Sequence, residues 1–459
     1  MRLVLFAVIA SWLSNGEIAA LAADRTPCRI AIVERESGWP VPLVELRTVH
    51  GYRFVSDNAG VIAFDLPELM GKETWFEISG HGYGVKPDGF GYKGVRLRPE
   101  AGQQLTVTVE RRILAQRLGR LTGTGLFAES QKVGEYLNWV DGPVLGCDSV
   151  VTAHFGGKMF WFWGDTHLAN YPLGIFNVSA ATTATFTPPA RPPLQVRFDY
   201  FLNPQGTARG VAEVPGDGPT WVWGAATVLD AQGREHLVAS AVKVRNNLEA
   251  YRWDLVEWET ATAKFKPLKT FWTRSAESAQ APKIPEGHAI KWTDAAGKAW
   301  LLYGNPFPTM RCPATYEAWQ NPQTWENLAA DRQVRTAEGK TIEPHGGDIA
   351  WHPWSQQWVA IFTQKGGVHS YLGEIWIAFA PAPHGPWQQA RQVASHDNYT
   401  FYNPVLRPEA FRADSSLIHF EGTYVTTFTN NQQPTPRWDY NQVLYQVDLA
   451  QAAFKPASK

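Results

Sequence analysis

The chain has 459 residues, more than a single hydrophobic core usually supports, so we expect two folded domains. Its formal net charge of -1 argues against nucleic acid or an anionic membrane surface as the main partner. Three cysteines are too few for a disulfide scaffold, and no Cys-x-x-Cys or paired-histidine spacing predicts a zinc site. No apolar run reaches the roughly 20 residues of a membrane-spanning helix, so we expect no membrane insertion.

The first segment has the features of a secretory signal peptide. One arginine precedes the apolar run VLFAVIASWL, and Ala20-Leu21-Ala22 offers a small-residue cleavage site. We therefore assign residues 1–23 to a signal peptide. The mature protein is expected to be secreted, periplasmic or on the cell surface, and to be a monomer.

Residues 24–112 are predicted to form a small β-sandwich. Runs such as RIAIVE, VPLVELRTV, GVIAFDL and QLTVTVER alternate or stay apolar between turns rich in Gly, Pro and Asn. Their order around the turn Asp57-Asn58-Ala59-Gly60 resembles the transthyretin-like, carboxypeptidase-regulatory module, which implies a spacer or adhesion role. Residues 113–139 are predicted to be a linker with a short helix, because Ile113–Leu121 has helical periodicity.

Five later segments share one pattern, in which a turn precedes aromatic and β-branched residues and a small or amide residue follows. They read GKMFWFWGDT from Gly157, GPTWVWGAAT from Gly218, GKAWLLYGNP from Gly297, QQWVAIFTQK from Gln356 and GTYVTTFTNN from Gly422. Their starts are about 60 to 80 residues apart, which suits one four-stranded sheet per unit. We predict a five-bladed β-propeller over residues 140–452, with the last strand, Gln442–Leu449, closing the ring with an early blade.

Aromatic residues are abundant, with 21 Trp, 23 Phe and 15 Tyr. Aromatic side chains stack on sugar faces, but they also fill the wedges between propeller blades. We expect most of them, including Trp161, Trp163, Trp221 and Trp223, to be blade core.

The segment before each aromatic strand is predicted to be the innermost strand of its blade, with its first residues lining an axial funnel. Charges there are costly to bury unless they are paired or used, so they point to an axial function. The candidates at these starts are Asp148 in blade 1, Arg209 in blade 2, Glu286 and His288 in blade 3, His345 in blade 4, and Tyr402 and Asn403 in blade 5.

Blades 1 and 3 carry a resemblance to known enzymes. The segments CDSVVTAHFGGKMFWFWGDT and EGHAIKWTDAAGKAWLLYG resemble the acid-bearing strands of five-bladed propeller glycosidases, which include arabinanases, β-xylosidases and invertase-like enzymes. The pairing of Asp-Ser with WFWGDT is also similar to endo-D-arabinanase-type propellers, whose acids lie on the first blade. The resemblance implies a glycoside hydrolase acting on a polysaccharide or oligosaccharide, with Asp148 as general base or nucleophile and Glu286 as general acid. Asp165 is the alternative partner on blade 1.

Blade 2 departs from the pattern of that family. Those glycosidases place a third aspartate there, whereas this chain has Arg209 at the aligned start. An arginine near Glu286 would lower the pKa of that carboxyl, which is the wrong direction for a general acid. Alternatively, Arg209 binds a carboxylate or sulfate of an acidic polysaccharide. His288, His345, Tyr402 and Asn403 are the other candidate substrate-binding residues.

Two further functions fit the same funnel. A non-catalytic glycan-binding or adhesion propeller would hold a sugar without cleaving it, and a polysaccharide lyase would use a His or Tyr base. We expect no cofactor and no catalytic metal, with a structural calcium ion on the axis left as an alternative. A disulfide between Cys147 and Cys312 is also left open.

Overall fold

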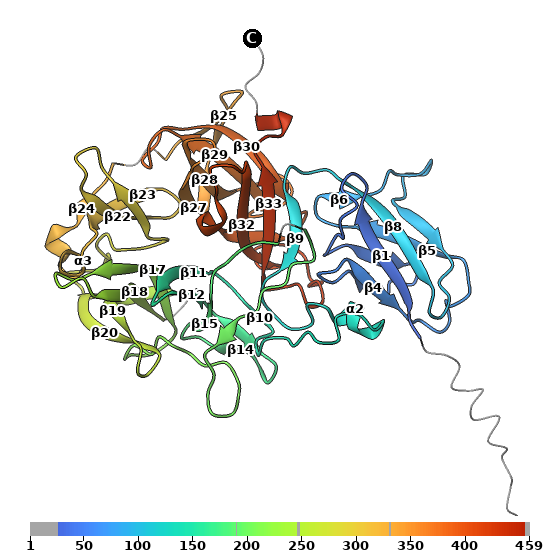
Figure 1. The fold of residues 1–459 in the computed structure, drawn as a ribbon, viewed down its shortest axis with the longest axis horizontal. Helices are drawn as coiled ribbons and strands as arrows, with labels where there is room; N and C mark the ends of the chain where they lie inside the picture. Colours follow the sequence, from blue (N-terminus) through green and yellow to red (C-terminus); the bar gives the residue numbers. More distant parts are fainter. Residues whose placement is uncertain (1–25, 190, 246–247, 330–331, 455–459) are drawn as a thin grey trace, which may run out of the picture.

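The computed structural model describes residues 26–189, 191–245, 248–329 and 332–454. The predicted signal peptide, residues 1–23, lies outside the described residues. The described chain is nearly all β and forms a series of mostly four-stranded sheets. In Figure 1 two of these sheets, in blue, stand beside a ring formed by the others. The protein is therefore a β-sandwich followed by a five-bladed β-propeller, as predicted.

The sandwich consists of two four-stranded sheets that pack face to face. One has the order β4-β1-β8-β6 and the other the order β3-β2-β5-β7. The strands are β1 Cys28–Glu34, β2 Glu45–Thr48, β3 Arg53–Val55, β4 Val61–Phe64, β5 Thr74–Ser79, β6 Tyr83–Gly84, β7 Gly94–Leu97 and β8 Gln104–Arg111. Every second residue of β1 is buried, as expected for a strand with one face on a core. Ile30, Ile32, Phe64 and Phe76 belong to that core.

The first three blades of the propeller follow one another in the sequence, and each is one four-stranded antiparallel sheet. Blade 1 contains β11 Val151–Phe155, β12 Lys158–Trp163, β15 Ser179–Thr183 and β16 Asp199–Tyr200. Blade 2 contains β17 Thr220–Leu229, β18 Glu235–Arg245, β19 Glu249–Glu259 and β20 Lys264–Thr273. Blade 3 contains β21 Ile290–Thr293, β22 Ala299–Gly304, β23 Pro308–Pro313 and β24 Glu326–Asn327. A small extra sheet lies beside blade 1, made of β10 Gly146–Cys147, β13 Thr166–Leu168 and β14 Tyr171–Ile175.

Blades 4 and 5 complete the ring. Blade 4 contains β27 Pro344–His352, β28 Gln357–Gln364, β29 Glu374–Ala380 and β30 Trp387–Ser395, and its outer edge carries β25 Val334–Thr336 and β26 Thr341–Ile342. Blade 5 contains β31 Thr400–Leu406, β32 Leu417–Val425, β33 Asn441–Asp448 and, as its fourth strand, β9 Gln116–Arg120. β9 precedes blade 1 in the chain, so the ring is closed by joining the start of the propeller to its end.

This closure corrects two predictions. The segment Ile113–Leu121 does not form a helix, because Gln116–Arg120 pairs as a strand with β33. The last strand also closes the ring with this connecting segment and not with an early blade. Leu118 is fully buried and Leu121 nearly so, which explains why the apolar spacing resembled that of a helix. An unpaired edge of β33 offered more backbone hydrogen bonds to this segment than an isolated helical turn would.

Blade 2 corrects a third prediction. The first strands of all five sheets contribute residues to one shared cavity, so they are the inner strands. In blades 1, 3 and 4 the aromatic segment is the second strand, as predicted, whereas in blade 5 only Gly422–Val425 of the predicted segment lie in the second strand, β32. In blade 2 the aromatic segment is β17 itself, so it is the inner strand, and Arg209 precedes it outside the named strands.

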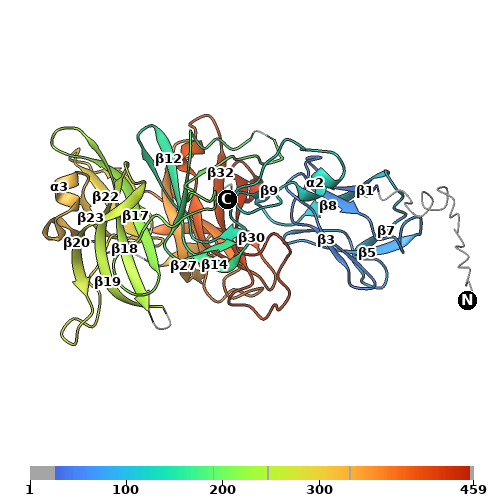
Figure 2. The same ribbon diagram turned by 90° about the horizontal axis from the view of Figure 1, so that it is seen from below.

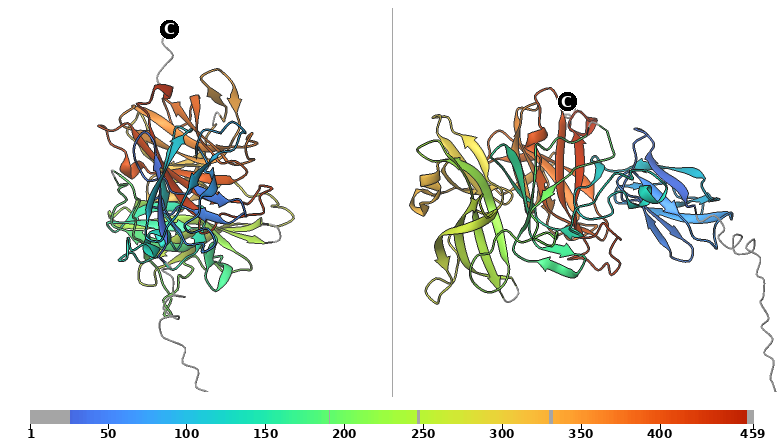
Figure 3. Two further views of the ribbon diagram at one scale, coloured as in Figure 1. Left: turned by 90° about the vertical axis from the view of Figure 1, so that its right-hand side faces the viewer. Right: turned by 60° about the horizontal axis from the view of Figure 1, so that its bottom comes forward.

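The sandwich docks on the closing strand. The Asn58 side chain accepts a hydrogen bond from the Arg120 backbone amide at 2.9 Å and donates one to the Arg120 carbonyl at 2.9 Å. Gly119 lies against the side-chain amide group of Asn58, and a Cβ on Gly119 would come within 3.0 Å of that group. The buried Arg117 guanidinium donates to the carbonyls of Pro42, Leu43 and His81 in the sandwich. Figures 2 and 3 show the sandwich on the side of the ring where β9 lies.

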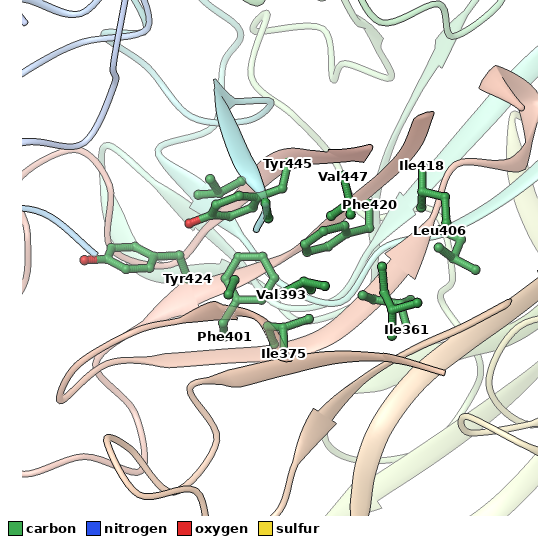
Figure 4. Close-up of a cluster of buried hydrophobic side chains, with 14 of the residues drawn as sticks. Ile361, Ile375, Val393, Phe401, Leu406, Ile418, Phe420, Tyr424, Tyr445 and Val447 are labelled. Carbon is green, nitrogen blue, oxygen red and sulfur yellow. The ribbon is translucent and has the colours of Figure 1, made fainter. Parts of the chain in front are cut away.

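Apolar and aromatic side chains fill the wedges between neighbouring blades. Figure 4 shows the wedge between blades 4 and 5, where Ile361 and Ile375 meet Phe401, Phe420 and Tyr445. Trp161 and Trp163 are fully buried in another wedge, as predicted, because burying each large ring stabilises the contact between two blades. The propeller is therefore held together mainly by these wedges.

Helices are short and peripheral. The α-helices are α2 Ala128–Lys132 and α3 Tyr316–Trp319, and 3-10 turns occur at Pro322–Thr324, Pro408–Ala410 and Ala452–Phe454. Within the described ranges, none is long and apolar enough to cross a membrane. Cys28, Cys147 and Cys312 are buried free thiols, and Cys147 and Cys312 belong to different hydrophobic clusters. The structure therefore contains no disulfide between Cys147 and Cys312.

Candidate functional site

Asp148 lies at the N-terminal end of the inner strand of blade 1, in the turn between β10 and β11. Its backbone is anchored to the end of β12, since the Gly164 amide donates to the Asp148 carbonyl at 2.8 Å and the Asp148 amide donates to the Asp165 carbonyl at 3.3 Å. One carboxylate oxygen lies over Gly164, where a Cβ would come within 2.2 Å of it. Only glycine leaves room for the Asp148 carboxyl in this position.

Two tyrosines from blade 5 and its loop contact the Asp148 carboxyl. The Tyr402 hydroxyl donates to Oδ2 at 2.5 Å, and the Tyr440 side chain also hydrogen-bonds to Asp148. Burial raises the pKa of Asp148 to about 7; the two hydroxyls oppose this increase, and the neighbouring Asp165 carboxylate adds to it. Asp148 therefore carries a proton up to near-neutral pH.

Asp165 is the second carboxyl of this end of blade 1. Its Oδ1 accepts a hydrogen bond from the Trp221 indole nitrogen of blade 2 at 3.0 Å. Burial raises the pKa of Asp165, and the Trp221 hydrogen bond opposes the increase. Both aspartates are partly accessible to solvent. Repulsion from the Asp165 carboxylate favours the protonated form of Asp148.

Contacts between neighbouring blades continue from this pair around the whole funnel. The Asn403 side-chain amide of blade 5 donates to the Ser149 hydroxyl of blade 1 at 2.8 Å. Gly346 of blade 4 lies between the side chains of Asn403 in blade 5 and Asn305 in blade 3. A Cβ on Gly346 would be 2.9 Å from the side-chain oxygen of Asn403 and 3.3 Å from that of Asn305. The Asn305 side chain also accepts from the Gly347 amide at 2.8 Å.

Blade 3 completes the ring through Gly287. The Gly224 amide of blade 2 donates to the Gly287 carbonyl at 2.8 Å. Gly287 has a positive φ of 71°, and a Cβ there would overlap the Gly304 carbonyl oxygen, so the position requires glycine. We call this end of the axis the mouth: Asp148, Asp165, Trp221, Glu286, Asn305, His345, Tyr402, Asn403 and Tyr440.

Glu286 and His345 lie at the mouth but are exposed to solvent. The surrounding protein raises the pKa of the Glu286 carboxyl, and the Arg332 guanidinium opposes this change. Desolvation lowers the pKa of His345, as does Lys365. Neither aspartate is among the groups that shift the pKa of Glu286. The carboxyl that shifts the pKa of Asp148 is that of Asp165.

Arg209 does not lie at the mouth, contrary to the prediction. Its guanidinium donates to the carbonyls of Thr262 and Ala263 at 3.1 and 2.9 Å, in the hairpin between the two outer strands of blade 2. Its side chain also lies over the Phe201 ring. The predicted conflict between Arg209 and Glu286 therefore does not exist, and the argument for an acidic substrate that rested on Arg209 is lost.

His288 is also displaced from its predicted place at the mouth. It lines a cavity further along the axis, together with residues from the C-terminal halves of the inner strands. Asp348 lies in the same cavity wall, and its carboxyl accepts from the amides of Ile349 and Leu406 at 2.8 and 3.1 Å. Its pKa is raised to about 7 by burial. Asp348 therefore has a structural role, because it holds the backbone amides of blades 4 and 5.

The mouth also contains residues that the sequence interpretation missed. Trp221 was predicted to be blade core, yet it is only partly buried and holds Asp165. Asn305 and Tyr440 come from turns outside the inner strands. One signal for Asn305 was available, since the aromatic repeat of blade 3 ends in an amide residue before proline. Among the described residues, no cluster of three or more His, Cys, Asp or Glu side chains could hold a metal ion.

Comparisons with known proteins give distant structural similarities only. No model of a protein family matches the chain, and a search of curated proteins finds no match. One similar solved structure is an exo-β-1,3-galactanase from Phanerochaete chrysosporium with galactose (12% identity, TM-score 0.37, 65% of this chain and 60% of that chain). A second is an exo-1,5-α-L-arabinanase from a bovine ruminal metagenomic library (13%, 0.39, 67% and 94%).

A third similar structure is a GH43_1 enzyme from Xanthomonas citri (8% identity, TM-score 0.36, 73% of this chain and 90% of that chain). The chain thus spans about 60% of the length of the galactanase. Similarities this distant do not bear on substrate or activity. The propeller is established by its own five sheets, and its function has to be argued from the mouth.

Proposed function

We propose that this protein is a glycoside hydrolase whose reaction takes place at the mouth of the propeller. The observation that carries the proposal is the pair Asp148 and Asp165, two coupled carboxyls of one blade, of which Asp148 keeps its proton to about pH 7. Cleavage of a glycosidic bond needs one carboxyl that is protonated and one that is ionised. The pair meets this requirement near neutral pH.

In the proposed reaction, Asp148 is the general acid. It donates its proton to the glycosidic oxygen as the bond to the anomeric carbon breaks, and the leaving sugar departs as an alcohol. Asp165 is ionised and takes a proton from the water whose oxygen forms the new bond to the anomeric carbon, and its negative charge also stabilises the positive charge that develops on the sugar ring. This gives Asp148 the general-acid role that the resemblance implied for Glu286, because the Asp148 carboxyl keeps its proton to about pH 7.

The other residues of the mouth would bind and orient the substrate. Tyr402 and Tyr440 hold the Asp148 carboxyl in place, and Trp221 holds Asp165. Glu286 and His345 are exposed and have no hydrogen-bond partner among the described residues, so they are free to bind sugar hydroxyls. We propose an extracellular polysaccharide as the substrate, in keeping with the signal-peptide features of residues 1–23.

The test is digestion of a glycan library by the full-length mature protein and by single variants. Asp148→Asn and Asp165→Asn are expected to lower product release by about 10²–10⁴-fold, the usual contribution of a general acid or base. Asp217→Asn, which changes an exposed aspartate of blade 2, should leave the rate unchanged. If Glu286→Gln loses most of the activity and Asp165→Asn keeps it, the catalytic role proposed for Asp165 belongs to Glu286.

Other outcomes would change the class of function. Products carrying an unsaturated sugar would identify a lyase. Retention of a glycan by the wild-type protein without product release would identify a glycan-binding propeller. Equal product release by the wild type and Asp148→Asn would exclude Asp148 from the mechanism.

A further inference from the structure

A second cavity lies at the other end of the propeller axis. Its volume is about 440 Å³, within the range of about 300–1,000 Å³ that is typical of small-molecule sites. All five blades contribute to its wall. Blades 2, 4 and 5 do so from the C-terminal halves of β17, β27 and β31, blade 1 from the middle of β11, and blade 3 from residues 288–291 at the start of β21. Thr152, Thr227, His288, Trp351 and Glu409 are among the lining residues.

Three of these side chains, those of His288, Glu409 and Trp351, have groups or surfaces that a ligand can contact. No described residue forms a hydrogen bond with the His288 ring, and burial lowers its pKa to about 3, with a contribution from Arg407. The ring is therefore neutral, with one nitrogen that donates and one that accepts. A hydroxyl group, which both donates and accepts, complements it.

Glu409 supplies an acceptor on the neighbouring part of the wall. Its Oε2 atom is buried and has no hydrogen-bond partner among the described residues. Arg407 is 3.7 Å from the other oxygen of Glu409, but that guanidinium is already committed to Glu421 and to the Thr152 hydroxyl. A buried carboxylate oxygen without a donor is costly, so a ligand that supplies one would be favoured.

Trp351 supplies a flat apolar surface. Its side chain remains 45% exposed although it packs edge-on against Trp358 with ring centroids 6.1 Å apart. Alanines of blades 1, 2, 3 and 4 form much of the remaining wall. A tryptophan face beside unpaired hydrogen-bonding groups matches a sugar ring, which presents C–H groups on one face and hydroxyls around its edge.

We propose that this cavity is a second saccharide site, which binds one neutral sugar ring by stacking on Trp351 and by hydrogen bonds to Glu409 and His288. The other carboxyl of its wall, Asp348, is held by the backbone amides of Ile349 and Leu406, so the proposed site binds without cleaving. A protein with one site at each end of the axis can hold a polysaccharide chain at one end while a chain enters the mouth. The proposal does not depend on the chemistry of the mouth.

The test is isothermal titration calorimetry of the full-length mature protein with galactose, xylose and arabinose, each at concentrations up to about 20 mM. At least one of them should bind to the wild type. Trp351→Ala and Glu409→Gln are each expected to weaken this binding by at least about 10-fold. Trp354→Ala is the matched control, because Trp354 is similarly exposed at 42% but is not among the lining residues.

Asp148→Asn separates the two sites, because it changes the mouth and leaves this cavity intact. Binding that persists in Asp148→Asn and is lost in Trp351→Ala supports the proposal, whether or not the protein hydrolyses glycans. The proposal is overturned if none of the three sugars binds. It is also overturned if binding is lost in Asp148→Asn and kept in Trp351→Ala. Circular dichroism of each variant will confirm that a loss of binding does not result from unfolding.

Discussion

Two carboxyls of the propeller, the partly accessible Asp148 at the mouth and the buried Glu421 in blade 5, have different neighbours. Glu421 and Arg407 are both completely buried and form a close ion pair, and the Arg407 guanidinium also lies 4.5 Å above the Trp161 ring. Asp148 forms no ion pair with the residues that the structure describes; its neighbours are two tyrosine hydroxyls and a second carboxyl. A carboxyl paired with arginine is committed to structure. A carboxyl held by neutral donors keeps a proton that it can give to a substrate.

The largest expected effect comes from breaking the ion pair. Arg407→Met leaves Glu421 buried without its partner, so we expect the free energy of unfolding to fall by about 3–5 kcal/mol. The measurement is the midpoint of urea denaturation, followed by tryptophan fluorescence. The double variant Arg407→Met with Glu421→Leu removes the unpaired charge and should recover much of this loss. If the single variant is as stable as the wild type, the pair is not structural.

The pH dependence of stability tests the protonation of carboxyls that have no arginine partner, such as Asp148. The pKa values of Asp148 and Asp348 are each raised to about 7 from an ordinary value near 3.8. Between about pH 4 and pH 7 the folded protein therefore holds protons that the unfolded chain releases, so stability falls as the pH rises through this window. We expect each group to contribute about 1–2 kcal/mol, less than the full shift implies, because partial exposure screens Asp148.

Thermal denaturation of the wild type at pH 5 and pH 8 measures this effect. The melting temperature should be higher at pH 5, and the difference should shrink in Asp148→Asn and in Asp348→Asn. Asp294→Asn is a control, because that aspartate lies in the hairpin turn between β21 and β22 and the pKa of its carboxyl is lowered. A pH dependence that is the same in all variants would refute the assignment.

A smaller change at the mouth should move the pH profile of activity. The Tyr402 hydroxyl lowers the pKa of Asp148, so Tyr402→Phe should raise that pKa further, by about one unit. If Asp148 is the general acid, the alkaline limb of the rate profile moves to higher pH. If it is the general base, the acidic limb moves to higher pH instead.

The control for this variant is Tyr316→Phe. The Tyr316 hydroxyl donates to Glu257 at 2.6 Å between blades 2 and 3, away from the mouth. Its removal should leave both limbs of the rate profile unchanged. An unchanged profile in Tyr402→Phe would mean that the hydrogen bond to Asp148 does not control its protonation in the reaction.

The smallest effect is expected at Arg209. Because its guanidinium binds carbonyl groups of the hairpin between β19 and β20, Arg209→Met should cost less than about 1 kcal/mol of stability. The rate of glycan digestion and its pH profile should not change. A change in substrate affinity in this variant would place Arg209 at the mouth after all.

The sequence predicted the ring correctly because the signal for a blade is local. Each aromatic run follows a turn and contributes residues to a strand, and buried aromatic side chains such as those of Trp161 and Trp163 fill a wedge between blades. Asp148 was found for the same reason, since it directly precedes an inner strand. Arg209 was misplaced because the prediction assumed that every aromatic run is a second strand, and blade 2 breaks that rule.

The sequence by itself determined the class of this protein: a sandwich, five repeated sheets, and an acidic residue, Asp148, close before the inner strand of blade 1. Only the tertiary structure decided which strand closes the ring and which partners each carboxyl meets. Gln116–Arg120 becomes a strand because the open edge of β33 is available to it. Asp148 meets Tyr402 and Tyr440 from a blade at the other end of the propeller sequence. Backbone pairing over such separations and the burial of each carboxyl depend on the complete ring, and these set the proton affinities on which the proposed chemistry rests.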